Sequence, residues 1–114
     1  MKAEIETPET QIKAEVAQSF LKKAKGLSFR TSGKMLFKFK KDTRSKVDMM
    51  FLSKPLYLYF LDSDKTVLEI QKAEPWSLNP RTWRLYSPGK TYRYLLESFE
   101  DLGLEEGQKT RFEI

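Results

Sequence analysis

The stretch LYLYFLDSDKTVLEI, residues 56–70, has the pattern of two strands joined by a tight turn. Residues 56–61 are a continuous apolar and aromatic run of strand length, which is typical of a strand covered on both faces. Residues 66–70 end in an alternation of polar and apolar side chains, as in a strand with one buried face. The intervening residues 62–65 are turn formers. The stretch therefore predicts a β-hairpin.

Outward from this hairpin, several segments have strand patterns. Over residues 35–40, Phe37 and Phe39 fall on one face and Lys38 and Lys40 on the other. Further strands are predicted over residues 12–17, 82–86, 91–97 and 109–114, with polar or Pro- and Gly-containing connections at 41–46, 74–80 and 87–90. We expect a β-rich α+β domain, built as a compact antiparallel sheet or a partly closed β-barrel with one or two short helices.

Two interpretations fit the N-terminal segment. Residues 12–17 alternate in polarity, which favours a strand. Four apolar residues at four-residue spacing instead favour one long amphipathic helix. These are Ile12, Val16, Phe20 and Ala24. In the strand interpretation, Ser19 caps a short helix over residues 20–25 that Gly26 closes, and Ser98 begins a second helical turn that ends at Gly103.

An ordered set of segments resembles the motifs of the domain of unknown function 192 family. The segments are AKGLSFR at 24–30, MLFKF at 35–39, Pro55-Leu56 leading to Phe60-Leu61-Asp62, then Val67, and YLLE at 94–97. The resemblance covers about residues 12–112. It implies a β-rich, barrel-like fold with a strand at 12–17 and a short helix after Ser19. The family has no agreed biochemical activity, so the resemblance implies no catalytic residues.

The chain departs from the family pattern just before the hairpin. Where the family has Trp-Met-x-Asn-Thr, only Met49 is present, with Asp48, Phe51 and Leu52 at the Trp, Asn and Thr positions. If the family shares a chemistry at this segment, the loss of these polar groups predicts that this chain lacks it.

Length and composition indicate a small single domain. The chain has 114 residues, of which 39% are hydrophobic and 13% aromatic, enough apolar material for one core. We assign residues 11–114 to this domain and residues 1–10 to an N-terminal extension. The chain contains no Cys and no His, so we expect no disulfide, no metal and no cofactor. The polar start of the chain and the absence of long apolar runs favour a cytoplasmic protein without a membrane partner.

Positive charge is concentrated in two segments. Residues 21–54 hold eleven Lys or Arg and two Asp, a net charge of +9, and residues 76–94 hold four basic residues and no acid. If the two segments meet in the fold, they would form an anion-binding face. Arginines beside aromatic residues also suit single-stranded nucleic acid. The candidate residues are Lys38, Lys40, Lys41, Arg44, Arg81, Arg84 and Arg93.

The most favoured function is a non-enzymatic domain that binds a small ligand or a protein partner. The loop over residues 74–86, which contains prolines and tryptophans, is the predicted place of binding. The candidate residues are Arg30, Trp76, Trp83 and Tyr86. Weak nucleic-acid binding is one alternative. Metal-assisted hydrolysis at Asp62 and Asp64 is another, although acidic residues in a turn more often bond the local backbone.

Overall fold

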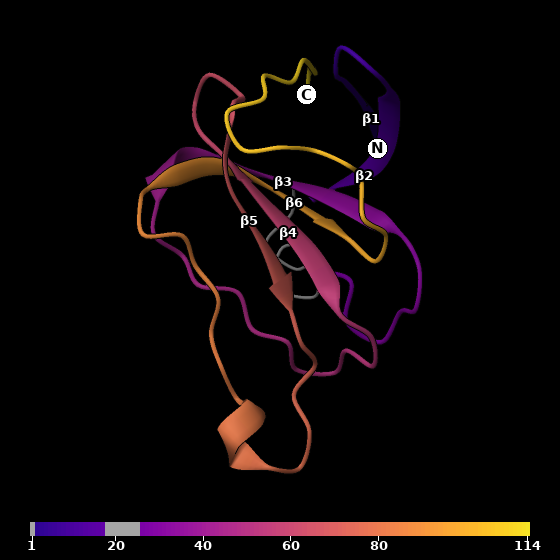
Figure 1. Ribbon diagram of the computed structural model, residues 1–114, viewed down its shortest axis with the longest axis vertical. Helices are drawn as coiled ribbons and strands as arrows, with labels where there is room; N and C mark the ends of the chain where they lie inside the picture. The colour runs from indigo at the N-terminus through magenta and orange to yellow at the C-terminus, as the bar shows by residue number, and fades with distance from the viewer. Residues whose placement is uncertain (1, 18–25) are drawn as a thin grey trace.

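The computed structural model describes residues 2–17 and 26–114, which form one six-stranded sheet (Figure 1). The strands are β1 (Lys2–Glu6), β2 (Gln11–Ala17), β3 (Lys34–Thr43), β4 (Leu56–Leu61), β5 (Val67–Ala73) and β6 (Tyr92–Ser98). Their order in the sheet is β1-β2-β3-β6-β4-β5. β2 and β3 are parallel, and every other pair of neighbours is antiparallel.

Five of the predicted strands are confirmed as β2 to β6. β2 settles the N-terminal ambiguity as far as Ala17 in favour of the strand, and β3 extends into the predicted connection as far as Thr43. β1 was not predicted. It lies in the segment assigned to an N-terminal extension, and it buries Ala3 and Ile5. Only these two apolar side chains mark it as a strand, which explains why the sequence pattern did not reveal it.

The predicted hairpin is confirmed as β4 and β5. One carboxylate oxygen of Asp62 accepts hydrogen bonds from the backbone N–H groups of Asp64 (2.8 Å) and Thr66 (3.0 Å). Lys65 adopts a left-handed conformation (φ 66°), and the strand register shifts after Phe60. A turn closed by a left-handed residue and a bulge is a common way to join two antiparallel strands.

The sheet differs from the expected one in two respects. It is mixed, because β2 and β3 run parallel, and it does not close into a barrel, because β1 and β5 are its edges. The predicted last strand over residues 109–114 is also wrong. In its place the C-terminal segment makes single bridges to both edges of the sheet, from Arg111 to Glu6 and from Lys109 to Thr66 (Figure 1).

The predictions of the helices and of the strand at residues 82–86 also need correction. The described residues contain one helical turn, the 3₁₀ helix η1 (Pro80–Thr82), which occupies the start of the strand predicted at 82–86. Ser98 begins no helix. Its hydroxyl accepts the N–H of Glu100 in a turn (3.0 Å). The short helix predicted over residues 20–25 lies outside the described residues, which contain no helix long and apolar enough to cross a membrane.

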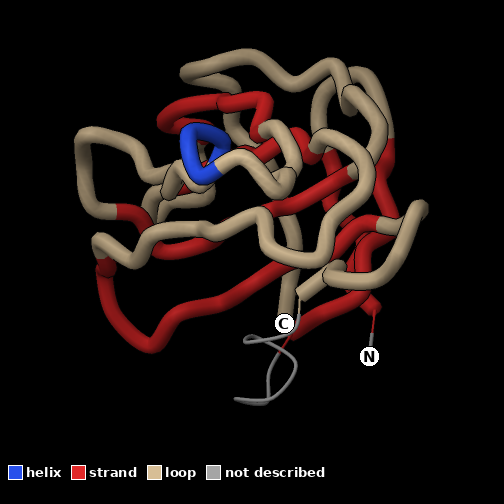
Figure 2. Tube along the Cα trace, turned by 90° about the horizontal axis from the view of Figure 1, so that it is seen from below, coloured by secondary structure: helices blue, strands red, loops and turns tan. Residues whose placement is uncertain are grey.

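Both faces of the sheet are covered, so the core has two halves. The C-terminal segment packs on one face, with Leu104 and Phe112 against Tyr94. On the other face, loops pack Leu27, Met49, Leu52 and Tyr86 onto the inner strands. Figure 2 shows these loops in tan, running over the strands.

Two tyrosines of β6 that strict alternation would place on one face lie in opposite halves of the core. Tyr92 packs against Phe60 in one half of the core, and Tyr94 packs against Phe112 in the other. The pairing of β3 with β6 loses its regular register between Lys38 and Thr43, beside these residues. Alternation along β6 therefore fails between Tyr92 and Tyr94, opposite the irregular part of β3.

Candidate functional site

A pocket of about 340 Å³ opens on the face of the sheet that the loops cover. Its floor consists of side chains from β3, β4 and β6, and its walls come from the turn at 26–28, the segment 45–48 and Leu52. The described lining is mostly apolar, with Leu27, Phe37, Phe39, Val47, Leu52, Leu56, Tyr92 and Leu95. The polar side chains are Ser28, Ser45, Lys46, Asp48 and Glu97.

Backbone hydrogen bonds hold the wall at 45–48 over the sheet. The Tyr92 hydroxyl donates to the carbonyl of Ser45 (2.6 Å). Val47 and Tyr86 form a β-bridge with two backbone hydrogen bonds of 2.8 and 2.9 Å. The wall is therefore fixed both to β6 and to the segment that follows η1.

The opposite wall is a turn that is tied to residues 50 and 51. The N–H of Phe29 donates to the carbonyl of Phe51 (2.9 Å), and their rings stack with centroids 4.6 Å apart. Gly26 has a positive φ of 54°, and a Cβ added to it would lie 3.4 Å from Oε1 of Glu97. This backbone therefore approaches the carboxyl group closely.

Glu97 is the distinctive residue of the pocket. It lies on the inner strand β6, between Met35 of β3 and Leu58 of β4, and only 6% of its surface is exposed. Among the described residues, no group donates a hydrogen bond or forms an ion pair with its carboxyl. Buried acids normally have such partners. Because no side-chain oxygen of the described residues is both closed off from solvent and without a partner, the Glu97 carboxyl keeps access to the space of the pocket.

Burial dominates the titration of this carboxyl. Burial, with a smaller contribution from the nearby negative charge of Asp48, raises the pKa of Glu97 from 4.5 to about 8. One oxygen of Asp48 accepts the N–H of Met50 (3.1 Å), which fixes that carboxylate in the pocket wall. Burial, with a contribution from Glu97, also raises the pKa of Tyr92 to about 12. Glu97 therefore carries its proton at neutral pH and can both donate and accept a hydrogen bond.

Within residues 2–17 and 26–114, no group of three or more acidic side chains comes together as metal ligands. A second hollow of about 620 Å³ lies along the C-terminal segment, where Glu4, Glu6 and Asp64 mix with Lys65, Lys109 and Arg111. Because both acidic and basic side chains line this hollow at the edge of the sheet, it does not favour one class of ligand.

The four predicted ligand-binding residues do not line the pocket. Trp76 and Trp83 stack at the tip of the loop (centroids 6.2 Å apart), where both indole N–H groups donate to carbonyls of the same loop. Tyr86 is buried beside the pocket wall and accepts the N–H of Glu74 (3.1 Å). Arg30 forms an ion pair with Glu15 (2.7 Å). Figure 1 shows that the loop with η1 projects from the rest of the molecule.

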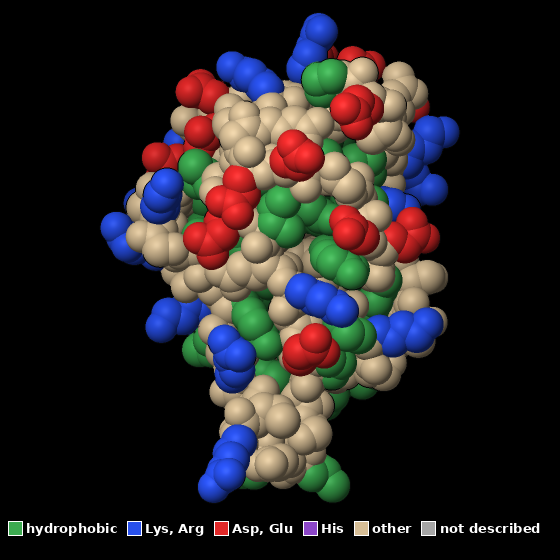
Figure 3. Space-filling model, viewed as in Figure 1, with side chains coloured by type: hydrophobic (Ala, Val, Ile, Leu, Met, Phe, Trp, Pro, Cys, Tyr) green, Lys and Arg blue, Asp and Glu red, His purple; other side chains and the backbone are tan. Residues whose placement is uncertain are grey.

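Five of the seven predicted anion-binding residues lie on or directly after the paired strands β3 and β6, and the other two lie in or just after η1. Lys38, Lys40, Lys41 and Arg44 lie on β3 or directly after it, and Arg93 on β6 pairs with Asp42 (3.0 Å). Arg81 lies in η1, and Arg84 lies over the ring of Tyr86 (5.3 Å to the centroid). On the face drawn in Figure 3, basic and acidic side chains are interspersed. The two basic segments lie side by side where β3 pairs with β6 and again at the bridge from Val47 to Tyr86.

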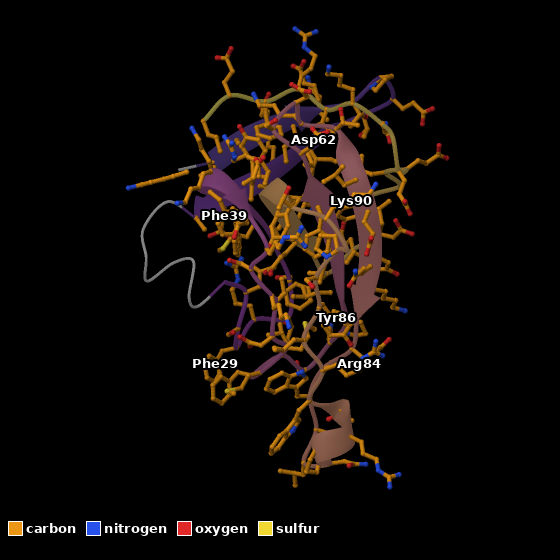
Figure 4. The ribbon with its side chains drawn as sticks, turned by 90° about the vertical axis from the view of Figure 1, so that its left-hand side faces the viewer. Phe29, Phe39, Asp62, Arg84, Tyr86 and Lys90 are labelled. Atoms are coloured by element: carbon orange, nitrogen blue, oxygen red, sulfur yellow. The ribbon has the colours of Figure 1, made fainter. Side chains whose placement is uncertain are left out.

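The pocket was not anticipated from the sequence. One signal was present, because Glu97 follows Leu95 at the two-residue spacing that places both on one face of a strand. A carboxyl group on the apolar face of an inner strand is unusual. Figure 4 shows Phe39 and Phe29 on the same side of the molecule, and the two pocket walls, at 26–28 and 45–48, lie just before Phe29 and after Phe39 in the chain.

Comparison with known proteins gives a family and a fold. The sequence model of the DUF192 family, described as "Uncharacterized ACR", matches residues 2–112. A UPF0127 protein of Pyrococcus abyssi is 33% identical over 88 residues, which are 75% of this chain and 69% of that protein. A UPF0127 protein of Pyrococcus furiosus is 29% identical over 108 residues, covering 89% of this chain and 87% of the relative.

Two crystal structures share the architecture. A candidate transcription regulator of Sinorhizobium meliloti matches with a TM-score of 0.79 and 22% identity, over 97% of this chain and 92% of that one. A protein of unknown function from Novosphingobium aromaticivorans matches with a TM-score of 0.76 and 21% identity, over 96% and 83% of the two chains. At these identities the likeness concerns the fold alone.

Proposed function

Since the chain belongs to the DUF192 family, whose description specifies no activity, we propose its function from its own residues: it is a non-enzymatic domain that binds a small ligand. The proposed place of binding is the pocket above Glu97. It replaces the loop over residues 74–86 as the proposed site, because the tryptophans there are engaged with each other and with carbonyls of the same loop.

The observation that carries this proposal is the buried carboxyl without a partner at the floor of an apolar pocket. Small-ligand sites are typically apolar hollows of about 300–1,000 Å³ with a few convergent polar groups. The pocket above Glu97, at about 340 Å³, has this size and this kind of lining. A strongly raised pKa in a hollow is a further mark of a functional group.

The alternatives receive less support. Tyr92 and Tyr94 are buried in opposite halves of the core, so they cannot stack on the bases of a nucleic acid. The Asp62 carboxylate is engaged by turn N–H groups, as in a structural Asx turn, which leaves hydrolysis at Asp62 and Asp64 without a second argument. Nucleic-acid binding, a protein partner at the loop tip and a cytoplasmic location stay predictions.

Small aromatic probes test the proposal. Benzamidinium, benzamide and benzoate have one shape and three different charges. We expect at least one of them, at millimolar concentration, to shift the NMR signals of the Leu27, Val47 and Leu95 backbone amides. The measurement is a series of ¹H–¹⁵N correlation spectra over a probe titration.

Two variants give this experiment its controls. Val47→Trp fills the pocket from its wall and should remove the shifts, whereas Leu78→Ala changes a side chain that is 98% exposed and should leave them unchanged. If none of the three probes shifts these amides in the native protein, the pocket is not a ligand site.

A further inference from the structure

The pocket contains two carboxyl groups, and no described cation pairs with either of them. Glu97 lies at the floor and Asp48 in the wall. Lys46 also lines the pocket, but it is exposed to solvent, and no ion pair joins it to either carboxyl. Asp48 is exposed and keeps its hydration, but Glu97 is buried, so its ionised form is stable only when hydrogen-bond donors and positive charge reach it. Glu97 is neutral in the free pocket at pH 7, and a cation with N–H groups is the kind of ligand that would stabilise its ionised form.

Aromatic rings surround the same space. Phe37, Phe39 and Tyr92 all line the pocket, and the face of an aromatic ring attracts a cation. The remaining lining is aliphatic, with Leu27, Leu52, Leu56 and Leu95 among the side chains. A ligand that suits both features has a positive group and an apolar body.

We propose that the pocket binds an organic cation, an ammonium, amidinium or guanidinium group on a small apolar body. Its N–H groups donate to the carboxylate of Glu97, and its apolar body packs against Phe37 and Leu95. This inference rests on the proposed function, since it specifies the ligand class of the same pocket.

Binding of such a cation releases a proton. Because burial and Asp48 raise the pKa of Glu97 to about 8, the free pocket holds a neutral carboxyl at pH 7. On binding, the O–H bond of the carboxyl breaks, its electron pair stays on Glu97, and the proton passes to the solvent. The ligand keeps its own protons, so charge and atoms balance.

The other groups that face this carboxyl are few. Asp48 and Lys46 come from the segment 45–48, and Tyr92 lies on the same strand. β3, β4 and the turn at 26–28 contribute only uncharged side chains to the described lining. The pH dependence of binding is therefore governed by Glu97. Below its pKa the affinity for a cation should decrease about tenfold for each pH unit.

Isothermal titration calorimetry with benzamidinium and its neutral isostere benzamide tests the proposal. At pH 8.5 we expect benzamidinium to bind at least tenfold more tightly than benzamide. At pH 6.0 its affinity should be about a hundredfold lower, and that of benzamide should not decrease. Titrations at pH 7.0 in two buffers with different protonation enthalpies should report close to one proton released per ligand.

Substitutions identify the group responsible. Glu97→Gln should remove the preference for benzamidinium over benzamide, and the matched control Glu106→Gln, at an exposed site, should keep it. If Glu97→Gln does not fold, Asp48→Asn serves in its place, and the steep part of the pH dependence should then move to lower pH. Equal affinities for the two probes at pH 8.5 would overturn the cation proposal and leave the pocket as a ligand site. Failure of both probes would overturn both proposals.

Discussion

The protein should lose stability as the pH rises from 5 to 9, and most of this loss should disappear in Glu97→Gln. The pKa of Glu97 is 4.5 in the unfolded chain and about 8 in the folded one. Between these pH values the folded state holds a proton that the unfolded state has released, so raising the pH favours unfolding. At about 1.4 kcal/mol for each unit of pKa, the full contribution is about 5 kcal/mol, reached above pH 8.

Urea denaturation of the native protein and of Glu97→Gln over this pH range provides the measurement. The free energy of unfolding of the native protein should decrease relative to that of the variant, with the difference growing between pH 4.5 and pH 8. Other ionisable groups titrate in both proteins, so they cancel in this difference. Glu106→Gln is the matched control, since it removes an exposed carboxyl. If the free energies of unfolding of the native protein and of Glu97→Gln depend on pH in the same way, Glu97 has the same pKa in the folded and unfolded states, and the prediction is wrong.

The second large effect is expected at Phe112, on the other face of the sheet. Its ring is 5% exposed and packs edge-on against Tyr94, with centroids 5.0 Å apart. The adjacent residues tie the C-terminal segment to both sheet edges. Arg111 exchanges backbone hydrogen bonds with Glu6 (2.7 and 2.9 Å), and Thr110 donates two to the carbonyl of Lys65 (2.8 and 3.0 Å). Phe112→Ala should therefore lower the free energy of unfolding by about 3–5 kcal/mol.

The control for this prediction is an exposed apolar residue. Leu78→Ala should change the free energy of unfolding by no more than about 0.5 kcal/mol. The dependence on urea concentration should stay the same in both variants, because each unfolds the same surface. A loss of under about 1 kcal/mol in Phe112→Ala would mean that the C-terminal segment does not contribute to the core.

The strands could be predicted from the sequence because each has a local signal. Alternation in residues 12–17 and 35–40 and the apolar run at 56–61 depend only on which side chains face a core. The pairing of β2 with β3 has no local signal, since a parallel pair is joined by a long connection. Nor does the sequence reveal that the C-terminal segment would bridge two edges instead of adding a strand.

The pocket also has no local signal in the sequence. Its walls come from residues 26–28 and 45–48, which are far apart in sequence and meet only when the chain folds. Tyr92 lies on the pocket face, against strict alternation with Tyr94, opposite the irregular part of β3. The raised pKa of Glu97 depends on its burial and on the nearby charge of Asp48, which are properties of the packing and not of the residue.

The loop over residues 74–86 has prolines and tryptophans, which predict a binding loop, but in the structure its tryptophans stabilise the loop itself. Trp76 and Trp83 do lie together, as a binding loop would require, but each indole N–H stabilises the loop itself. Trp83 is 54% exposed and forms part of an apolar tip with Leu78 and Leu85. Prolines and tryptophans between strands therefore marked an ordered projection, and the candidate ligand pocket lies elsewhere.

The most direct measurement of the central claim is a pH titration of the Glu97 side-chain carboxyl by ¹³C NMR. We expect it to titrate near pH 8 in the free protein and at a lower pH in the presence of benzamidinium. Titration near pH 4.5 in the free protein would contradict a buried carboxyl without a partner. A midpoint near 8 that benzamidinium leaves unchanged would contradict its role in binding a cation.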